Sequence, residues 1–159
     1  MVSLEVGTDK LVPNQWNSRR MPDNVFGKLV AYIREVGVVA QIVVREHPKE
    51  TGKYEILGGE HRWKAACKLK LATVPIGVVE CKNDVAAKKM SINLNHIEGA
   101  DDPALLARLL AEISRSENIE SLVETMPFRE EDFKTAAAEF EKDFDESQNG
   151  VDGENQSTT

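Results

Sequence analysis

A strand-like segment that runs directly into a basic helix is the feature that most constrains this chain. Residues 54–57 have the composition of a strand, Gly58 and Gly59 interrupt it, and residues 60–69 then read as a helix with an apolar inward face. Glycines at such a turn let the backbone approach a ligand closely. The N–H groups and the dipole at a helix N-terminus favour an anion there. The segment therefore predicts a strand, a tight turn and a helix start that binds an anion.

Two basic side chains support the prediction of an anion. Arg62 and Lys64 lie in the first turns of this helix, where positive charge opposes the helix dipole when no anion is bound. Arg62 can form a bidentate contact with a phosphate, and Lys64 supplies a point charge. The same residues also suit an ordinary tight turn with surface charges, so the pattern alone leaves a structural role open.

The rest of the chain predicts an α+β domain followed by helices. Residues 2–6 alternate as a short strand, and β-branched runs predict strands at residues 42–45 and 74–79. Pro75 near the start of the last strand favours an edge position in the sheet. Helix starts are predicted at Asp23, Asp84 and Pro103, and further helices at residues 119–126 and 130–144.

Charge is distributed unevenly along the chain. Residues 1–96 carry 15 Lys and Arg against 10 Asp and Glu, whereas residues 97–159 carry 5 against 17. The basic N-terminal part suits a polyanionic ligand, although the whole chain has a net charge of −7. The acidic part is either a set of solvated helix faces or a competitor of the polyanion. Residues 145–159 contain one aliphatic residue, which predicts a disordered acidic tail.

Composition excludes membrane-spanning and disulfide-rich secreted classes. No apolar run approaches the roughly 18 residues that a transmembrane helix needs, and the N-terminus lacks the basic and apolar regions of a secretory signal. Two cysteines, Cys67 and Cys81, are too few for a disulfide scaffold. We therefore expect a cytoplasmic protein with reduced thiols and no membrane contact.

Three further side chains have competing roles. Cys67 lies on the helix after the glycines and is expected to pack against the sheet. Trp63 on the same helix is expected in the core or at its edge. Trp16 lies in a loop near two arginines, where stacking on a base or a partner competes with ordinary packing.

Five ordered motifs resemble the ParB/sulfiredoxin superfamily, and most closely its ParB N-terminal domain. Residues 59–65 (Gly-Glu-His-Arg-Trp-Lys-Ala) are similar to the superfamily's G-E-R-R-x-R-A box. The other matching segments are residues 11–19, 37–45, 74–76 and 93–95, in the family's order. The resemblance covers residues 2 to about 115 and implies a small mixed β-sheet with packed helices, plus a helical C-terminal extension.

The resemblance also implies a domain organisation and a ligand. It implies a ParB-like nucleotide-binding domain over residues 1–100, a helical extension over residues 101–144 and the acidic tail over residues 145–159. In this family the box and the later E-N-L-Q-R segment bind the phosphates of a nucleoside triphosphate, commonly CTP, together with Mg²⁺. By motif match the nucleotide-binding residues are Arg19, Gly37, Gln41, Gly58, Gly59, Glu60, His61, Arg62, Lys64, Asn93 and Asn95. Asn93 would also ligate the metal.

Departures from the family motifs bear on turnover. Ile92 stands where partition proteins have the Glu of E-N-L-Q-R, and His61 and His96 replace family arginines. An apolar side chain can neither ligate a hard cation nor orient an attacking water. We therefore expect nucleotide binding with hydrolysis slow or absent. Glu60, or Glu98 as the alternative, would supply the catalytic carboxylate of any turnover. Glu60 also stands where sulfiredoxin has its catalytic cysteine, so sulfur-based chemistry is not expected.

Two classes of function remain open. In the first, the chain is a nucleotide-dependent switch, with CTP or ATP as ligand, in DNA partition or another DNA-related process. We expect such a switch to be a homodimer that contacts DNA in a nucleotide-dependent or non-specific mode. Residues 127–133 are acidic where a recognition helix should be basic, so a sequence-specific DNA reader is not expected. In the second class, the chain is an enzyme of the same fold: a nuclease, an NTPase or a small-molecule kinase.

Overall fold

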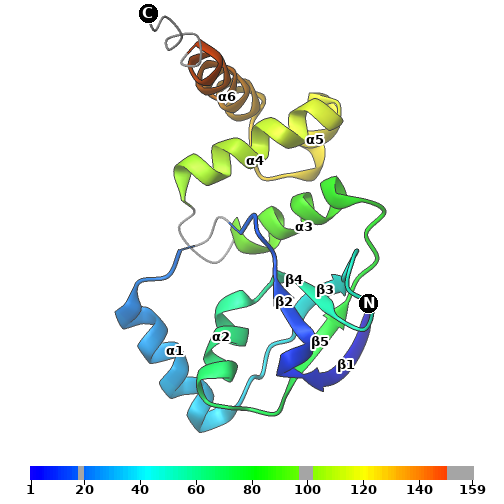
Figure 1. Ribbon diagram of the computed structural model, residues 1–159, viewed down its shortest axis with the longest axis vertical. Helices are drawn as coiled ribbons and strands as arrows, with labels where there is room; N and C mark the ends of the chain where they lie inside the picture. Colours follow the sequence, from blue (N-terminus) through cyan, green and yellow to red (C-terminus); the bar gives the residue numbers. More distant parts are fainter. Residues whose placement is uncertain (18–19, 97–101, 150–159) are drawn as a thin grey trace, which may run out of the picture. The chain divides into compact units, whose positions relative to one another are not determined.

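The chain folds into two compact units, Met1–Asp102 and Pro103–Thr159, in a computed structural model that describes residues 1–17, 20–96 and 102–149. Unit 1 holds a five-stranded sheet of order β1-β5-β3-β4-β2 together with helices α1 to α3 (Figure 1). A mixed sheet with packed helices confirms the predicted α+β class.

The strands of unit 1 combine antiparallel and parallel pairs. They are β1 (Val2–Gly7), β2 (Leu11–Pro13), β3 (Ile42–Glu46), β4 (Tyr54–Gly58) and β5 (Thr73–Val78). β3 and β4, both predicted as strands, form an antiparallel hairpin, whereas β5 pairs with β3 and β2 pairs with β4 in parallel. β2 is not predicted from the sequence, because three residues are too few to show an alternating pattern.

β5 is an interior strand, so the prediction that Pro75 places it at an edge is wrong. It lies between β1 and β3, with Pro75 opposite Glu5 of β1. The ladder between β5 and β3 begins only at Ile76, which pairs with Ile42. Pro75 therefore precedes that ladder, and a residue without an N–H is tolerated there.

The sheet is strongly curled, because its two outer strands are nearly contiguous in sequence. Only the 3-10 turn η1 (Thr8–Lys10) joins β1 to β2. The chain from Gly7 to Leu11 spans at most about 15 Å, whereas a flat sheet would hold its first and fifth strands about 19 Å apart. Trp63 packs beside this turn and donates from Nε1 to the Thr8 carbonyl oxygen at 3.0 Å, as expected for an aromatic at the edge of the core.

Helix α2 (Glu60–Lys68) lies between the sheet and α1 (Asp23–Val36). Ala66 packs against the buried residues of the sheet, and Ala65 packs against Val30 and Ile33 of α1. Small side chains on two faces of α2 allow this close layering. Cys67 does not pack against the sheet as expected but is exposed, because the two alanines before it occupy the buried side of the helix.

Three ionic side chains are joined in unit 1. Arg45 of β3 lies 2.7 Å from Glu55 of β4 and 2.9 Å from Asp84, measured from Nη2 to the carboxylate oxygens. Arg45 and Glu55 are buried. Burial alone would lower the pKa of the Arg45 guanidinium, but its bonds to Asp84 and Glu55 outweigh burial and raise the pKa. Asp84 begins α3 (Asp84–His96), so the cluster ties this helix to the sheet.

Over residues 103–149, unit 2 consists of three helices, α4 (Pro103–Ser116), α5 (Ile119–Thr125) and α6 (Glu130–Asn149). Their buried apolar residues include Leu109, Leu110, Ile113, Leu122 and Phe133. Helix α6 continues five residues past the predicted start of the acidic tail, because residues 145–149 contain no glycine or proline. Residues 150–159 lie outside the described residues. None of the helices within the described ranges is long and apolar enough to cross a membrane.

Candidate functional site

The N-terminus of α2 is the point at which several segments of unit 1 meet. β4 ends at Gly58, and Gly59 turns the chain into the helix with a φ of +93°. A Cβ added to Gly58 would lie 3.1 Å from Leu94 Cδ1 of α3, and one added to Gly59 would lie 3.0 Å from Arg62 Nη2. A side chain at either position would push on its neighbour, and at Gly59 the left-handed backbone itself favours glycine.

Glu60 contacts the side chains of Asn17 and Lys64, and Asn17 links it to Asn95. Asn17, in the loop after β2, donates from Nδ2 to the Glu60 carboxylate. Asn95 of α3 donates to Asn17 Oδ1 at 3.5 Å and to Ser91 Oγ at 3.3 Å. The Lys64 ammonium lies 3.6 Å from the other Glu60 oxygen. The predicted residues Glu60, Lys64 and Asn95 thus come together through Asn17.

Arg62 connects the first turn of α2 to the start of β3. Its Nη1 donates to the Gln41 carbonyl oxygen at 3.2 Å. The Gln41 side chain in turn donates to Ser3 Oγ of β1. The structure therefore places two of the predicted binding residues in direct contact and keeps a guanidinium beside the N-terminus of α2.

The remaining predicted residues differ in how they relate to this group. Gly37 ends α1 with a φ of +79°, and a Cβ there would meet no atom within 4 Å, so this glycine borders open space. His61 is half-buried in the first turn of α2. Asn93 lies on α3 with its Oδ1 buried. Arg19 lies outside the described residues.

Two asparagines of the loop after β2 were missed by sequence reasoning. Asn14 donates from Nδ2 to the Ile56 carbonyl oxygen at 2.7 Å and accepts from the Trp16 N–H at 3.1 Å. Asn17 reaches Glu60 as described above. Both asparagines lie in the matching segment 11–19, but their partners Ile56 and Glu60 are 42 and 43 residues away, and no local pattern encodes such contacts.

Trp16 is fixed by packing. The Arg45 Cζ and the Lys88 Nζ each lie 5.7 Å from its ring centroid, within cation–π range. Its indole N–H is buried and meets no acceptor among the described residues. Trp16 thus anchors the loop that carries Asn17, and through Arg45 it joins that loop to the ionic cluster of the sheet.

The site can hold an anion, and it offers few ligands for a metal. Gly59 contributes no side-chain cap to α2, so the dipole and the basic residues of the first turns face whatever binds there. Within the described residues, no group of three or more His, Cys, Asp and Glu side chains is placed to hold a metal ion. A cation at this site would need most of its ligands from a bound anion.

Comparison with known proteins decides the family. The family model described as the ParB N-terminal domain matches residues 2–95, more than half of the chain. The chain belongs to the ParB N-terminal domain family. Every described residue of the site lies within the matched segment, and unit 1 is therefore a ParB N-terminal domain.

The curated relatives of this ParB N-terminal domain carry names that refer to chromosome partitioning and nucleoid occlusion. The chromosome-partitioning protein ParB of Caulobacter vibrioides (strain NA1000 / CB15N) is 44% identical over 69 residues, which cover 43% of this chain and 22% of the relative. The nucleoid occlusion protein of Listeria innocua is 38% identical over 97 residues, covering 60% and 34%. The chain thus spans only a fifth to a third of the length of these relatives.

Solved structures of ParB share the fold. The C-terminally truncated chromosome-partitioning protein ParB from Caulobacter crescentus, complexed with CTP-gamma-S, matches with a TM-score of 0.57 and 30% identity, covering 86% of this chain and 77% of that chain. A structure of the truncated protein complexed to the centromeric parS site has a TM-score of 0.60 and 24% identity, with 84% and 69% covered. The second likeness shows the fold alone.

Proposed function

We propose that unit 1 binds a nucleoside triphosphate at the N-terminus of α2, and that CTP is the preferred ligand. The proposal rests mainly on the Gly58–Gly59 turn, which leads directly into a helix whose first turns hold Arg62 and Lys64. The similarity to a ParB that was solved with CTP-gamma-S supports the choice of nucleotide.

The phosphates would lie against the α2 N-terminus. Backbone N–H groups of a first turn and the helix dipole both favour a phosphate there. A guanidinium has five N–H donors, so Arg62 can hold the Gln41 carbonyl and also contact a phosphate. We propose that His61, Lys64 and Arg19 add contacts to the phosphates, and that Gly37 and Gln41 border the nucleoside.

Mg²⁺ would enter with the nucleotide. It prefers oxygen ligands in octahedral geometry, and it often binds through substrate phosphates and water with only one or two protein groups. The buried Oδ1 of Asn93 is the protein oxygen that we propose for it. This ligand set fits the scarcity of acidic clusters within the described part of unit 1.

Hydrolysis is proposed to be slow or absent. Ile92 is buried on α3, so an apolar group fills the position at which the family motif has a carboxylate. Glu98 lies outside the described residues, and among those described Glu60 is the remaining candidate base, but its carboxylate accepts from Asn17 and lies beside Lys64. A carboxylate so engaged is better placed to shape the turn than to abstract a proton. An enzyme that uses Glu60 remains the second candidate function.

We propose that nucleotide binding controls association with DNA, as part of partition or a related process. The basic charge of residues 1–96 suits the phosphate backbone of DNA in a non-specific mode. Residues 97–159 carry 17 acidic against 5 basic residues and disfavour DNA there. We propose a homodimer as the active form.

Isothermal titration of the full chain with CTP, ATP and GTP tests the proposal, with and without Mg²⁺. CTP should bind with Mg²⁺, and ATP and GTP should bind more weakly by about tenfold or more. Binding of ATP in preference to CTP would overturn the choice of base. A lack of heat change with all three nucleotides, confirmed by equilibrium dialysis, would overturn the nucleotide site itself.

A further inference from the structure

β1 is an outer strand with exposed side chains on both faces. It pairs only with β5 among the strands that the structure describes. Val2 is 61% exposed and Leu4 is 41% exposed, and Ser3 and Glu5 are exposed as well. Alternate backbone N–H and C=O groups of such an edge point away from the sheet and can pair with another strand.

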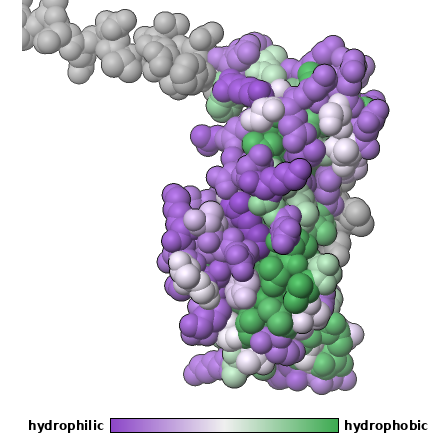
Figure 2. All heavy atoms as spheres, turned by 90° about the vertical axis from the view of Figure 1, so that its right-hand side faces the viewer, coloured by the Kyte–Doolittle hydropathy of each residue, from purple (hydrophilic) through white to green (hydrophobic). Residues whose placement is uncertain are grey.

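Val2 and Leu4 continue the apolar face of the core to the surface. They lie opposite Val78 and Ile76 in the antiparallel ladder, and opposite residues in such a ladder share one face of the sheet. Ile76 is completely buried in the core. Figure 2, viewed from the side on which Figure 1 draws β1, shows a broad hydrophobic surface.

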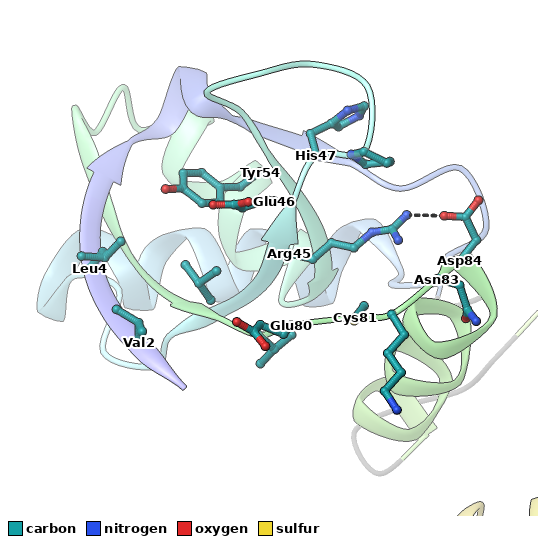
Figure 3. Close-up of a pocket in the computed structure, with 14 residues that line it drawn as sticks. Val2, Leu4, Arg45, Glu46, His47, Tyr54, Glu80, Cys81, Asn83 and Asp84 are labelled. Carbon is teal, nitrogen blue, oxygen red and sulfur yellow. Dashed lines mark hydrogen bonds and ion pairs between the residues drawn. The ribbon is translucent and has the colours of Figure 1, made fainter.

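A pocket of about 760 Å³ opens beside these two residues. Val2, Leu4, Tyr54 and Val78 give it apolar walls, and Glu46 and Glu80 add carboxylates. Figure 3 shows Val2 and Leu4 on one side of the pocket, with Tyr54, Glu46 and Glu80 across from them. The pocket lies on the same side of the sheet as the core, so it continues the surface that a strand added to β1 would cover.

The charges around the pocket favour a basic partner. Among the lining bases, Arg45 is engaged with Glu55 and Asp84, and the imidazole of His47 lies beside Glu50. Lys82 is the remaining basic residue of the lining. Glu46 and Glu80 form no ion pair with another described residue, and Glu5 adds a third exposed carboxylate on the outer face of β1. Once these ion pairs are set aside, the carboxylates around the pocket outnumber the basic side chains.

We propose that β1 and this pocket bind an extended segment of another polypeptide that is rich in apolar and basic residues. The backbone of the segment pairs with β1 as an additional strand, and its side chains alternate between the two faces of the sheet. Apolar side chains on the pocket face enter beside Leu4, a basic side chain on that same face meets Glu46 and Glu80, and the Lys or Arg side chains of the other face meet Glu5. A second copy of this chain is the competing occupant, but pairing of two β1 strands would bring these carboxylates of both copies together.

Titration of the full chain with the synthetic peptide Lys-Val-Lys-Leu-Lys-Lys-Lys, capped at both ends, tests this surface, because it places Val, Leu and one Lys on the same face of the strand. Chemical shifts of the β1 amides should move, and the same peptide with Glu for every Lys should bind at least tenfold more weakly. Two further peptides carry N-methyl groups on the backbone nitrogens of either the odd-numbered or the even-numbered residues. One of them should lose binding and the other should keep it, because only alternate N–H groups face the paired strand.

Variants of exposed residues locate the peptide. Leu4→Ser and the double variant Glu46→Gln/Glu80→Gln should each weaken binding about tenfold. Val39→Ser and Glu35→Gln, which change exposed residues outside the pocket, should not. Circular dichroism checks that all four fold, and unchanged CTP titrations separate this surface from the nucleotide site.

Three results would overturn the proposal. One is the absence of β1 shifts with the basic peptide. Another is a peptide affinity that the pocket variants leave unchanged. The third is a concentration-dependent dimer that Leu4→Ser dissociates and the peptide does not, because a second copy would then be the occupant of β1.

Discussion

Arg62 Nη1 donates to the carbonyl oxygen of Gln41 at 3.2 Å, so one guanidinium joins the first turn of α2 to the residue before β3. This residue is therefore part of the fold as well as the leading candidate for phosphate contact. Its replacement should affect stability and affinity by different amounts, and the two effects can be measured separately.

Arg62→Ala should weaken CTP binding by about ten- to a hundredfold, because a charge-assisted contact to phosphate contributes roughly 1.5–3 kcal/mol. Loss of the bond to Gln41 should lower the free energy of unfolding by only about 0.5–1.5 kcal/mol. Isothermal titration and urea denaturation measure the two quantities. Arg34→Ala on α1 is the matched control. Wild-type affinity in a folded Arg62→Ala protein would place the phosphates elsewhere.

Gly59→Ala should lower the free energy of unfolding by about 1–2 kcal/mol, because an L-residue is strained at a φ of +93°. The added methyl would also displace the Arg62 guanidinium. Gly27→Ala is the control: Gly27 lies within α1 and its Cβ would meet no atom within 4 Å, so alanine should stabilise by about 0.5–1 kcal/mol. Both tryptophans lie in unit 1, so fluorescence during urea unfolding reports this unit. Equal free energies of unfolding for the two variants would contradict the left-handed backbone conformation of Gly59.

Glu55→Leu should destabilise unit 1 by about 3–5 kcal/mol, because it breaks a buried ion pair and leaves Arg45 with Asp84 alone. The Asp84 side chain is 67% exposed and compensates the buried charge poorly. The double variant Arg45→Met/Glu55→Leu should lose less, since no buried charge is then uncompensated. A double variant that is less stable than Glu55→Leu in urea would contradict this account.

The Cys81 thiol should react slowly with iodoacetamide. Burial raises the pKa of Cys81, and although the charge of Arg45 lowers it, the net direction is upward. The reactive thiolate is therefore scarcer than in an unfolded chain at the same pH. Stability should also fall as the pH rises from the ordinary thiol pKa through the raised one, because the unfolded thiol ionises first.

The reactivity test uses a Cys67→Ser variant, which leaves Cys81 as the only cysteine of the chain. The alkylation rate by mass spectrometry at pH 8 should be lower in the folded protein than in the same protein in urea. A faster rate in the folded protein would show that the charge of Arg45 dominates.

Wild-type protein with CTP and Mg²⁺ should release phosphate no faster than the buffer alone, because buried Ile92 supplies no ligand or base. A malachite-green assay measures the release. Turnover by the wild type that disappears in Glu60→Gln would instead support the enzyme class. Ile92→Glu is the candidate gain-of-function variant, but it would bury a carboxylate on α3 and should destabilise the fold. Circular dichroism must therefore show that the variant is folded before its activity is measured.

The sequence predicted the local elements well and their neighbours poorly. The strand, glycine turn and helix of residues 54–68 were predicted because each follows from short-range patterns. The interior position of β5 was not, since Pro75 carries an edge signal and its tolerance depends on where the ladder with β3 begins. The exposure of Cys67 depends likewise on the packing of α1 beyond α2.

The candidate site shows the same division. Arg62, Gly59 and Glu60 were chosen from a contiguous motif, and the structure places them at one helix start. Asn17 was missed because its role exists only once the loop after β2 reaches Glu60. The bond from Arg62 to Gln41 was missed for the same reason, because it joins two elements that are twenty-one residues apart.

The curl of the sheet sets the order in which the chain can complete its fold during synthesis. Both outer strands come from the first 13 residues, but β2 needs β4 at residues 54–58 and β1 needs β5 at residues 73–78. These long sequence separations slow folding, because a large loop must close before either pairing forms. β1 therefore precedes every other strand of this sheet in the chain but stays without its partner until residue 78 has been synthesised.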